Sequence, residues 1–117
     1  MKGDDIAQRL EIFAVRSLSV VNALPKTPAG RHIASQLLRC ASSPGANYEE
    51  ARGAESRADF IHKLRIALKE LQESRYWLRV IARAGFVPGK RLASLLGEAD
   101  QLCKIIGRSV LTAQSRR

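Results

Sequence analysis

The sequence is poor in aromatic residues, histidine and cysteine, and it has no long apolar run. Aromatic side chains make up 5% of its 117 residues, too few for the aromatic-rich strands of a β-sandwich. Its two histidines and two cysteines offer too few ligands for a zinc or di-iron centre, so no metal or cofactor is expected. Cys40 and Cys103 lie far apart among apolar neighbours, which predicts reduced core residues.

Long hydrophobic segments are missing as well. Nowhere do about eighteen apolar residues follow one another, and the amino terminus meets acid at Asp4. We therefore expect neither a membrane span nor a secretion signal, but a cytoplasmic protein.

Acidic residues are scarce relative to basic ones. Twenty Lys and Arg residues stand against eleven Asp and Glu residues, a formal charge of +9. Such a charge attracts polyanions, including RNA and DNA, although it also serves solubility alone. The distribution of the charge has to distinguish these possibilities.

Helical periodicity is present along nearly the whole chain, with breaks around Pro25, Gly53 and Gly85. The apolar spacing predicts one domain, residues 1–117, with helices over about 4–24, 28–52, 57–84 and 89–113. Connections of a few residues make successive helices antiparallel. The predicted fold is all-α, an antiparallel up-down-up-down four-helix bundle.

Local signals mark several helix ends. Thr27 before Pro28 predicts an N-cap, Ser56 with Asp59 resembles a capping box, and Gly85 suits a left-handed helix terminus. Pro44 falls inside the second helix, where we expect a kink and a serine hydroxyl, from Ser42 or Ser43, on the freed backbone groups.

The helix expected over residues 57–84 carries a basic ribbon. At about 100° per residue, its cations lie within about 40° of one line, with an aromatic ring among them. The predicted nucleic-acid-binding residues are Arg65, Lys69, Tyr76, Arg79 and Arg83. The cations would neutralise phosphates, and the tyrosine would stack on an unpaired base. The alternative is a solvated face, because long basic side chains at helical spacing are routine and Glu70 and Glu73 lie close enough for some pairing.

A second apolar stripe on the same helix lies about 120° from its core face. A large apolar stripe of this kind is typical of a subunit interface. The predicted interface residues are Ile66, Trp77, Val80 and Ile81. Alternatively, neighbouring helices of the same bundle cover the stripe.

No enzyme signature accompanies these features. The sequence has no P-loop, no Gly-x-Ser-x-Gly elbow and no Gly-x-Gly-x-x-Gly loop, and we expect no enzyme. Its glutamates are expected to pair with Arg39, Arg52 or Arg75 at helix contacts, because half-buried carboxylates need a partner.

Several blocks together resemble one family. They are Ser35–Ser43, Gly45–Ala51, Asp59–Glu70 and Tyr76–Leu78. The chain resembles the four-helix-bundle proteins encoded in intervening sequences of bacterial large-subunit rRNA genes, long labelled ribosomal proteins. Pro44 departs from the aliphatic residue usual at that position. The family's recurring positions, which look like packing and polar-network sites, are Arg39, Ser42, Asn47, Tyr48 and Glu70.

The resemblance implies a homo-oligomer, a pentameric ring. It also implies kinship with the accessory variability protein of diversity-generating retroelements, which binds nucleic acid and a reverse transcriptase. Two functions remain open at this point. The chain is either an oligomeric basic bundle that binds RNA or DNA through phosphates, or a scaffold that recruits another protein without touching nucleic acid.

Overall fold

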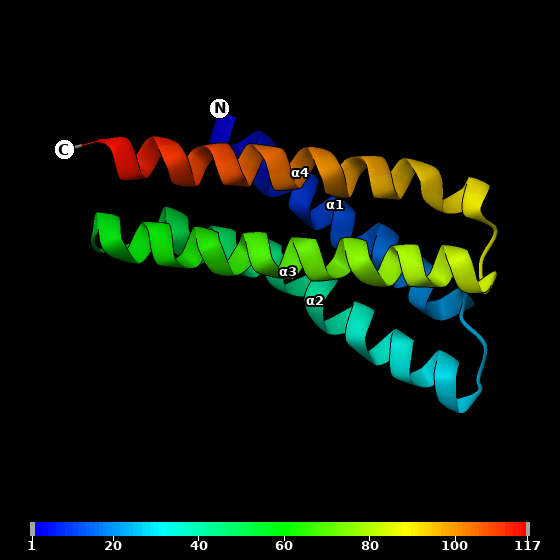
Figure 1. Ribbon diagram of the computed structural model, residues 1–117. Coiled ribbons are helices and arrows are strands. Elements are labelled where there is room, and N and C mark those ends of the chain that lie inside the picture. Colours follow the sequence, from blue (N-terminus) through cyan, green and yellow to red (C-terminus); the bar gives the residue numbers. More distant parts are fainter. Residues whose placement is uncertain (1, 117) are drawn as a thin grey trace.

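Four helices run alongside one another in the computed structural model, which describes residues 2–116 (Figure 1). They are α1 (Lys2–Ala23), α2 (Pro28–Arg52), α3 (Arg57–Ala84) and α4 (Gly89–Ser115). Successive helices are neighbours and α4 also contacts α1, whereas in the described chain the Cα atoms of α1 and α3, and those of α2 and α4, do not come within 8 Å of each other. The predicted all-α four-helix bundle is confirmed; the first and last residues of the predicted domain, 1 and 117, lie outside the described residues.

The four edges of the bundle are not equally tight. The bundle measures 50 × 23 × 20 Å, and the contact between α2 and α3 is the most extensive. The α1–α4 edge is the least extensive. It joins the first helix to the last, and no chain connection holds these two together.

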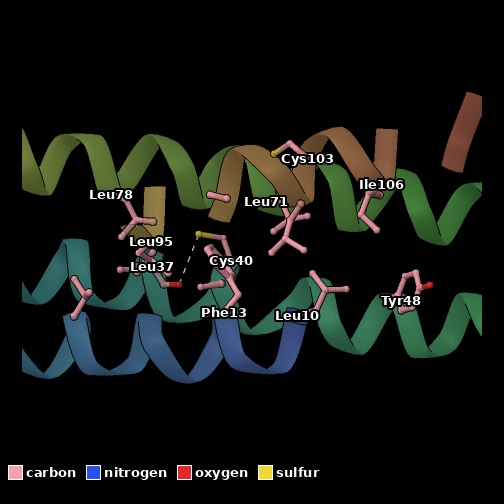
Figure 2. Packing of buried hydrophobic residues seen from close by; sticks show 14 of the residues in the cluster. Leu10, Phe13, Leu37, Cys40, Tyr48, Leu71, Leu78, Leu95, Cys103 and Ile106 are labelled. Carbon is pink, nitrogen blue, oxygen red and sulfur yellow. Dashed lines mark hydrogen bonds between the residues drawn. The ribbon is translucent and has the colours of Figure 1, made fainter. Parts of the chain in front are cut away.

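The core is mostly aliphatic and runs the length of the bundle. Each helix contributes fully or almost fully buried side chains that point towards its neighbours, among them Leu10, Phe13, Leu37, Leu71, Leu78, Leu95 and Ile106 (Figure 2). Cys40 and Cys103 are free and buried, in agreement with the prediction. Burial raises the pKa of both thiols.

The predicted caps at Thr27, Ser56 and Gly85 are confirmed, although the Asp59 side chain makes no described return bond to Ser56, and α1 and α4 run over Lys2–Ala23 and Gly89–Ser115 where about 4–24 and 89–113 were predicted. The Thr27 hydroxyl accepts a hydrogen bond from the backbone N–H of Gly30 at 3.1 Å, and the Ser56 hydroxyl accepts one from Asp59 at 3.1 Å. Gly85 ends α3 at a φ of 73°, the left-handed region. Gly30 is required by close approach, since a Cβ there would lie 2.0 Å from the carbonyl oxygen of Pro25.

The region around Pro44 agrees with the predicted helix but not with the predicted serine bond, and the kink stays a prediction. The α2 helix continues through Pro44 to Arg52 without interruption. The Ser42 hydroxyl donates to the carbonyl of Leu38 at 2.7 Å and not to the carbonyl of Cys40, which Pro44 leaves without its usual donor. A serine in a helix reaches the carbonyl three or four residues before it, so Ser43 is within reach of Cys40 and Ser42 is not. The described hydrogen bond of the Ser43 hydroxyl is instead one that it accepts from the Asn47 amide at 3.0 Å.

None of the helices described is both long and apolar enough to cross a membrane.

Candidate nucleic-acid interface

The basic ribbon forms the outward face of α3. The Arg65, Lys69, Arg79 and Arg83 side chains are all exposed, and Tyr76 between them is 51% exposed. Their helix turns its opposite face, including Leu64 and Leu71, into the core. Among residues 2–116, none of the four cations forms an ion pair. The ribbon is therefore a strip of uncompensated positive charge along one helix.

The glutamates nearest to the ribbon are occupied elsewhere. Arg39 of α2 donates to Glu70 at 3.2 Å and also to Glu73, as predicted for these glutamates. The Trp77 indole N–H donates to the same Glu73 at 3.1 Å. The bonds to Arg39 hold both carboxylates on the α2 side, so neither glutamate pairs with a ribbon cation; the alternative of a solvated basic face is not tested by these contacts. The hydrogen bond to Glu73 raises the pKa of the Arg39 guanidinium.

A groove between α3 and α4 adjoins the ribbon. It encloses about 420 Å³, and Gln72 and Lys104 are among its lining residues. The Arg75 guanidinium spans it to Asp100 at 3.0 Å. Sequence reasoning missed Lys104 because it lies on α4, and only the pairing of the two helices brings this exposed cation beside the α3 face. No signal within α4 alone would have found it.

Tyr76 is braced by aromatic neighbours. Its ring meets Trp77 edge to face, with centroids 5.0 Å apart. Trp77 in turn meets His32 of α2 at 6.0 Å, and its N–H is held by Glu73. Half of the Tyr76 surface nevertheless remains open to solvent.

The predicted interface stripe needs one correction. Ile81 is 0% exposed and belongs to the bundle core, so it is not available to another subunit. The core face of α3 is centred on Leu71, Leu78 and Ile81, because α3 packs against both α2 and α4 and buries a wide arc. Ile66, Trp77 and Val80 are half-buried. For these three, a role in an interface stays a prediction.

The described side chains form no group of three His, Cys, Asp or Glu residues suited to hold a metal ion.

Comparison with known proteins identifies the family of the chain. The family model for the 23S rRNA-intervening sequence protein matches residues 4–108. The chain belongs to this family.

A solved relative agrees with this assignment. The family member is similar to the crystal structure of a protein of unknown function from the S23 ribosomal protein family of Bacteroides thetaiotaomicron, with a TM-score of 0.84 and 33% identity. The similarity covers 90% of this chain and 97% of that one. No curated protein matches the chain.

The family's recurring positions have structural surroundings in this member. Arg39 and Glu70 form an ion pair across the α2–α3 edge, and Tyr48 is buried. The Asn47 amide donates to the backbone carbonyl of Ser43 at 3.1 Å, and Ser42 bonds within α2. These contacts join or stiffen helices, in agreement with packing and polar-network positions.

Proposed function

We propose that this protein is a cytoplasmic, non-enzymatic protein that binds RNA or DNA through phosphate groups on the outward face of α3. One observation carries the proposal: four exposed cations on one helix face have no carboxylate partner among the described residues, while the neighbouring glutamates are bound to Arg39. Cations that are already uncompensated give up no ion pair when a phosphate arrives.

The proposed binding is to the backbone and not to base sequence. The ribbon spans about 27 Å from Arg65 to Arg83 at 1.5 Å per residue, enough for several phosphates of one strand. Tyr76 adds a stacking surface for an unpaired base at the centre of the ribbon. Lys104, across the groove, extends the positive surface towards α4.

Salt-titrated fluorescence anisotropy tests this proposal, with labelled single-stranded RNA and duplex DNA of mixed sequence. Four phosphate contacts predict a log–log salt slope of about −3 to −4 between about 50 and 200 mM salt. Changing all four ribbon residues to Gln should weaken binding by about tenfold or more and flatten the slope. Tyr76→Ala should weaken binding to the single strand alone, by about 1–3 kcal/mol, and leave the slope unchanged.

A matched control separates the ribbon from net charge. Four other exposed cations, also without ion pairs in the described chain, receive the same change to Gln: Lys26, Arg31, Arg57 and Lys90. This variant should keep most of the affinity. Undetectable binding by wild type at low salt, or an equal loss in both variants, contradicts the proposal.

A protein-recruiting scaffold is the second candidate. The half-buried edge formed by Ile66, Trp77 and Val80 is the observation that favours it, because half-exposed apolar side chains suit a protein partner. Affinity purification after nuclease treatment distinguishes the two. Recovery of one protein partner supports the scaffold, whereas co-purifying nucleic acid that salt removes supports the first function.

A further inference from the structure

A cavity lies at one end of the bundle. The antiparallel order brings the first turns of α1 and α3 and the last turns of α2 and α4 together there (Figure 1). The cavity measures about 400 Å³, and all four helices contribute to its lining. Small-molecule sites in proteins have volumes of about 300–1,000 Å³. Tyr76, Arg79 and Arg83 of the ribbon lie near the other end of α3, so the cavity is a separate feature.

Small side chains leave this cavity open. It lies on the edge between α1 and α4, the least extensive edge of the bundle. The lining residues include Gly3 of α1 and Ser109 and Ala113 of α4, none of which is large enough to fill the space between the helices. At Gly3, the atoms nearest to an added Cβ would be in the Arg52 and Tyr48 side chains, at 3.6 Å or more. The space is therefore wide enough for a ligand.

The walls of the cavity are apolar. Ile6 of α1 is 8% exposed, and Phe60 of α3 and Ile105 of α4 are half-buried. These three side chains come from three different helices and line the same space. An aromatic or aliphatic body placed between them would remove more of their apolar surface from water, which is the main source of affinity in sites of this kind.

The charge of the lining is positive. Arg108 and Arg116 line the cavity from the carboxyl-terminal part of α4 and its C-cap, and both are exposed. Neither forms an ion pair with a described side chain. No Asp or Glu is among the described residues that line the cavity. The site therefore favours an anionic group, which two guanidinium groups can hold by charge-assisted hydrogen bonds.

A buried hydroxyl faces the same space without a partner. Tyr48 is 7% exposed and lines the cavity, and its hydroxyl makes no hydrogen bond to a described residue. Figure 2 shows this hydroxyl pointing away from Leu10. The nearby Arg52 is bound to Asp4 and Glu49 instead. Burial raises the pKa of the phenol, so at neutral pH the hydroxyl is a donor that lacks an acceptor.

The polar groups of the cavity stand on opposite walls. Tyr48 is on α2 and the two arginines belong to the α4 side, and α2 and α4 lie across the bundle from each other. The apolar wall of Ile6, Phe60 and Ile105 completes the lining between them. A ligand that satisfies all of these groups has an anionic group at one end, an apolar body, and an oxygen at the other end.

We propose that this cavity binds a small amphipathic carboxylate. The carboxylate contacts Arg108 and Arg116, an aromatic or aliphatic body packs against Ile6, Phe60 and Ile105, and an oxygen at the far end accepts a hydrogen bond from the Tyr48 hydroxyl. The site shares no residue with the basic ribbon, so the inference stands apart from the proposed binding of nucleic acid and can fail or succeed without it.

Fluorescence anisotropy with three naphthalene probes tests this proposal. The probes are a hydroxynaphthoate, with its hydroxyl at the end opposite the carboxylate, plain naphthoate, and neutral naphthol. Hydroxynaphthoate should bind most tightly, naphthoate up to about tenfold weaker because it lacks the far oxygen, and naphthol about tenfold or more weaker because it lacks the anion. Absence of binding by all three probes, or equal affinity for naphthol and hydroxynaphthoate, overturns the proposal.

Removing the two arginines tests the anionic end. Arg108→Gln combined with Arg116→Gln should weaken both naphthoates by about tenfold or more and leave naphthol unchanged. Lys90→Gln combined with Lys104→Gln is the matched control, because both lysines are exposed cations of α4 that do not line the cavity. This control should bind all probes as wild type does. An equal loss in the two double variants would show that net charge alone attracts the probes, and overturns the site.

Tyr48→Phe tests the other end with a readout that a packing role would not change. The variant should bind hydroxynaphthoate up to about tenfold more weakly and naphthoate as wild type does, so the two probes become equal. An equal loss for both probes would mean that the hydroxyl does not contact the ligand, and overturns this part of the proposal.

Filling the cavity tests its position. Ser109→Leu should abolish binding of all three probes, because a leucine occupies the space that the serine leaves open. Gly97→Leu is the control on the same helix, at a position where an added Cβ meets nothing within 4 Å. Circular dichroism shows whether each variant is folded. A folded Ser109→Leu variant that binds the probes as wild type does overturns the assignment of this cavity.

Discussion

Replacing either of two helical glycines by alanine should change the stability of the bundle in opposite directions. Gly30 is the third residue of α2 and is buried, and a Cβ there would lie 2.0 Å from the carbonyl oxygen and 2.9 Å from the carbonyl carbon of Pro25. Both atoms are backbone, so the connection between α1 and α2 has to move. Gly97 is an exposed residue of α4, and a Cβ there would meet nothing within 4 Å.

The magnitudes follow from these surroundings. In a helix interior, alanine is more favourable than glycine by about 1 kcal/mol, and Gly97→Ala should gain nearly all of it. At Gly30 the clash costs about 1–3 kcal/mol, and moving the connection weakens the bond between Gly30 and Thr27, a cap worth about 1 kcal/mol. Gly30→Ala should therefore lose about 1–3 kcal/mol. At roughly 4 °C per kcal/mol, Tm falls by about 4–12 °C for Gly30→Ala and rises by about 4 °C for Gly97→Ala.

Urea unfolding followed by circular dichroism measures both free energies of unfolding. All samples need the same protein concentration, because assembly would add to apparent stability. A Gly30→Ala variant as stable as wild type would refute the argument, since it would mean that the connection at Pro25 moves without cost. A Gly97→Ala variant less stable than wild type would show that this face of α4 is packed and not open.

Two further predictions concern buried polar and ionisable groups. The Ser17 hydroxyl is buried with no hydrogen-bond partner among the described residues, so Ser17→Ala should raise the free energy of unfolding by about 1 kcal/mol. Ser74→Ala is the control and should not raise it, because the Ser74 hydroxyl donates to the backbone carbonyl of Glu70 at 2.8 Å. Equal responses of the two variants in urea would contradict this. Burial raises the pKa of the Cys40 thiol and that of the Tyr48 phenol above their ordinary values, so the folded chain retains protons that the unfolded chain releases. The free energy of unfolding should keep its full value below about pH 9 and fall as the pH rises further. Tyr48→Phe should reduce this fall above about pH 10. A urea midpoint that does not change at alkaline pH would contradict the prediction.

The number of helices and several of their ends could be predicted because the signals are local. A threonine before proline, a serine three residues before aspartate, and a glycine after an apolar run each act within one helical turn. The basic ribbon was also predictable, since residues three, four and seven apart on a helix share a face whatever packs on the other side.

The boundary of the core could not be placed in the same way. Ile81 looks like part of a second stripe when α3 is considered alone, but α2 and α4 together bury a wider arc than one neighbour would. Ile12, Val15 and Leu18 already lie off the core spacing of the first helix, but only the positions of α2 and α4 show that all three remain exposed.

The sequence by itself determined an all-α chain of four helices, their capped ends, and the collection of cations on one face of α3, because these depend on the order of residues within a turn or two. Only the tertiary structure decided which charges remain uncompensated. Arg39 comes from another helix to hold Glu70 and Glu73, and Lys104 is brought beside α3. Ile12, Val15 and Leu18 of α1 are left exposed. Ion pairing and burial depend on distances between helices, and these distances cannot be derived from the spacing of residues along one helix.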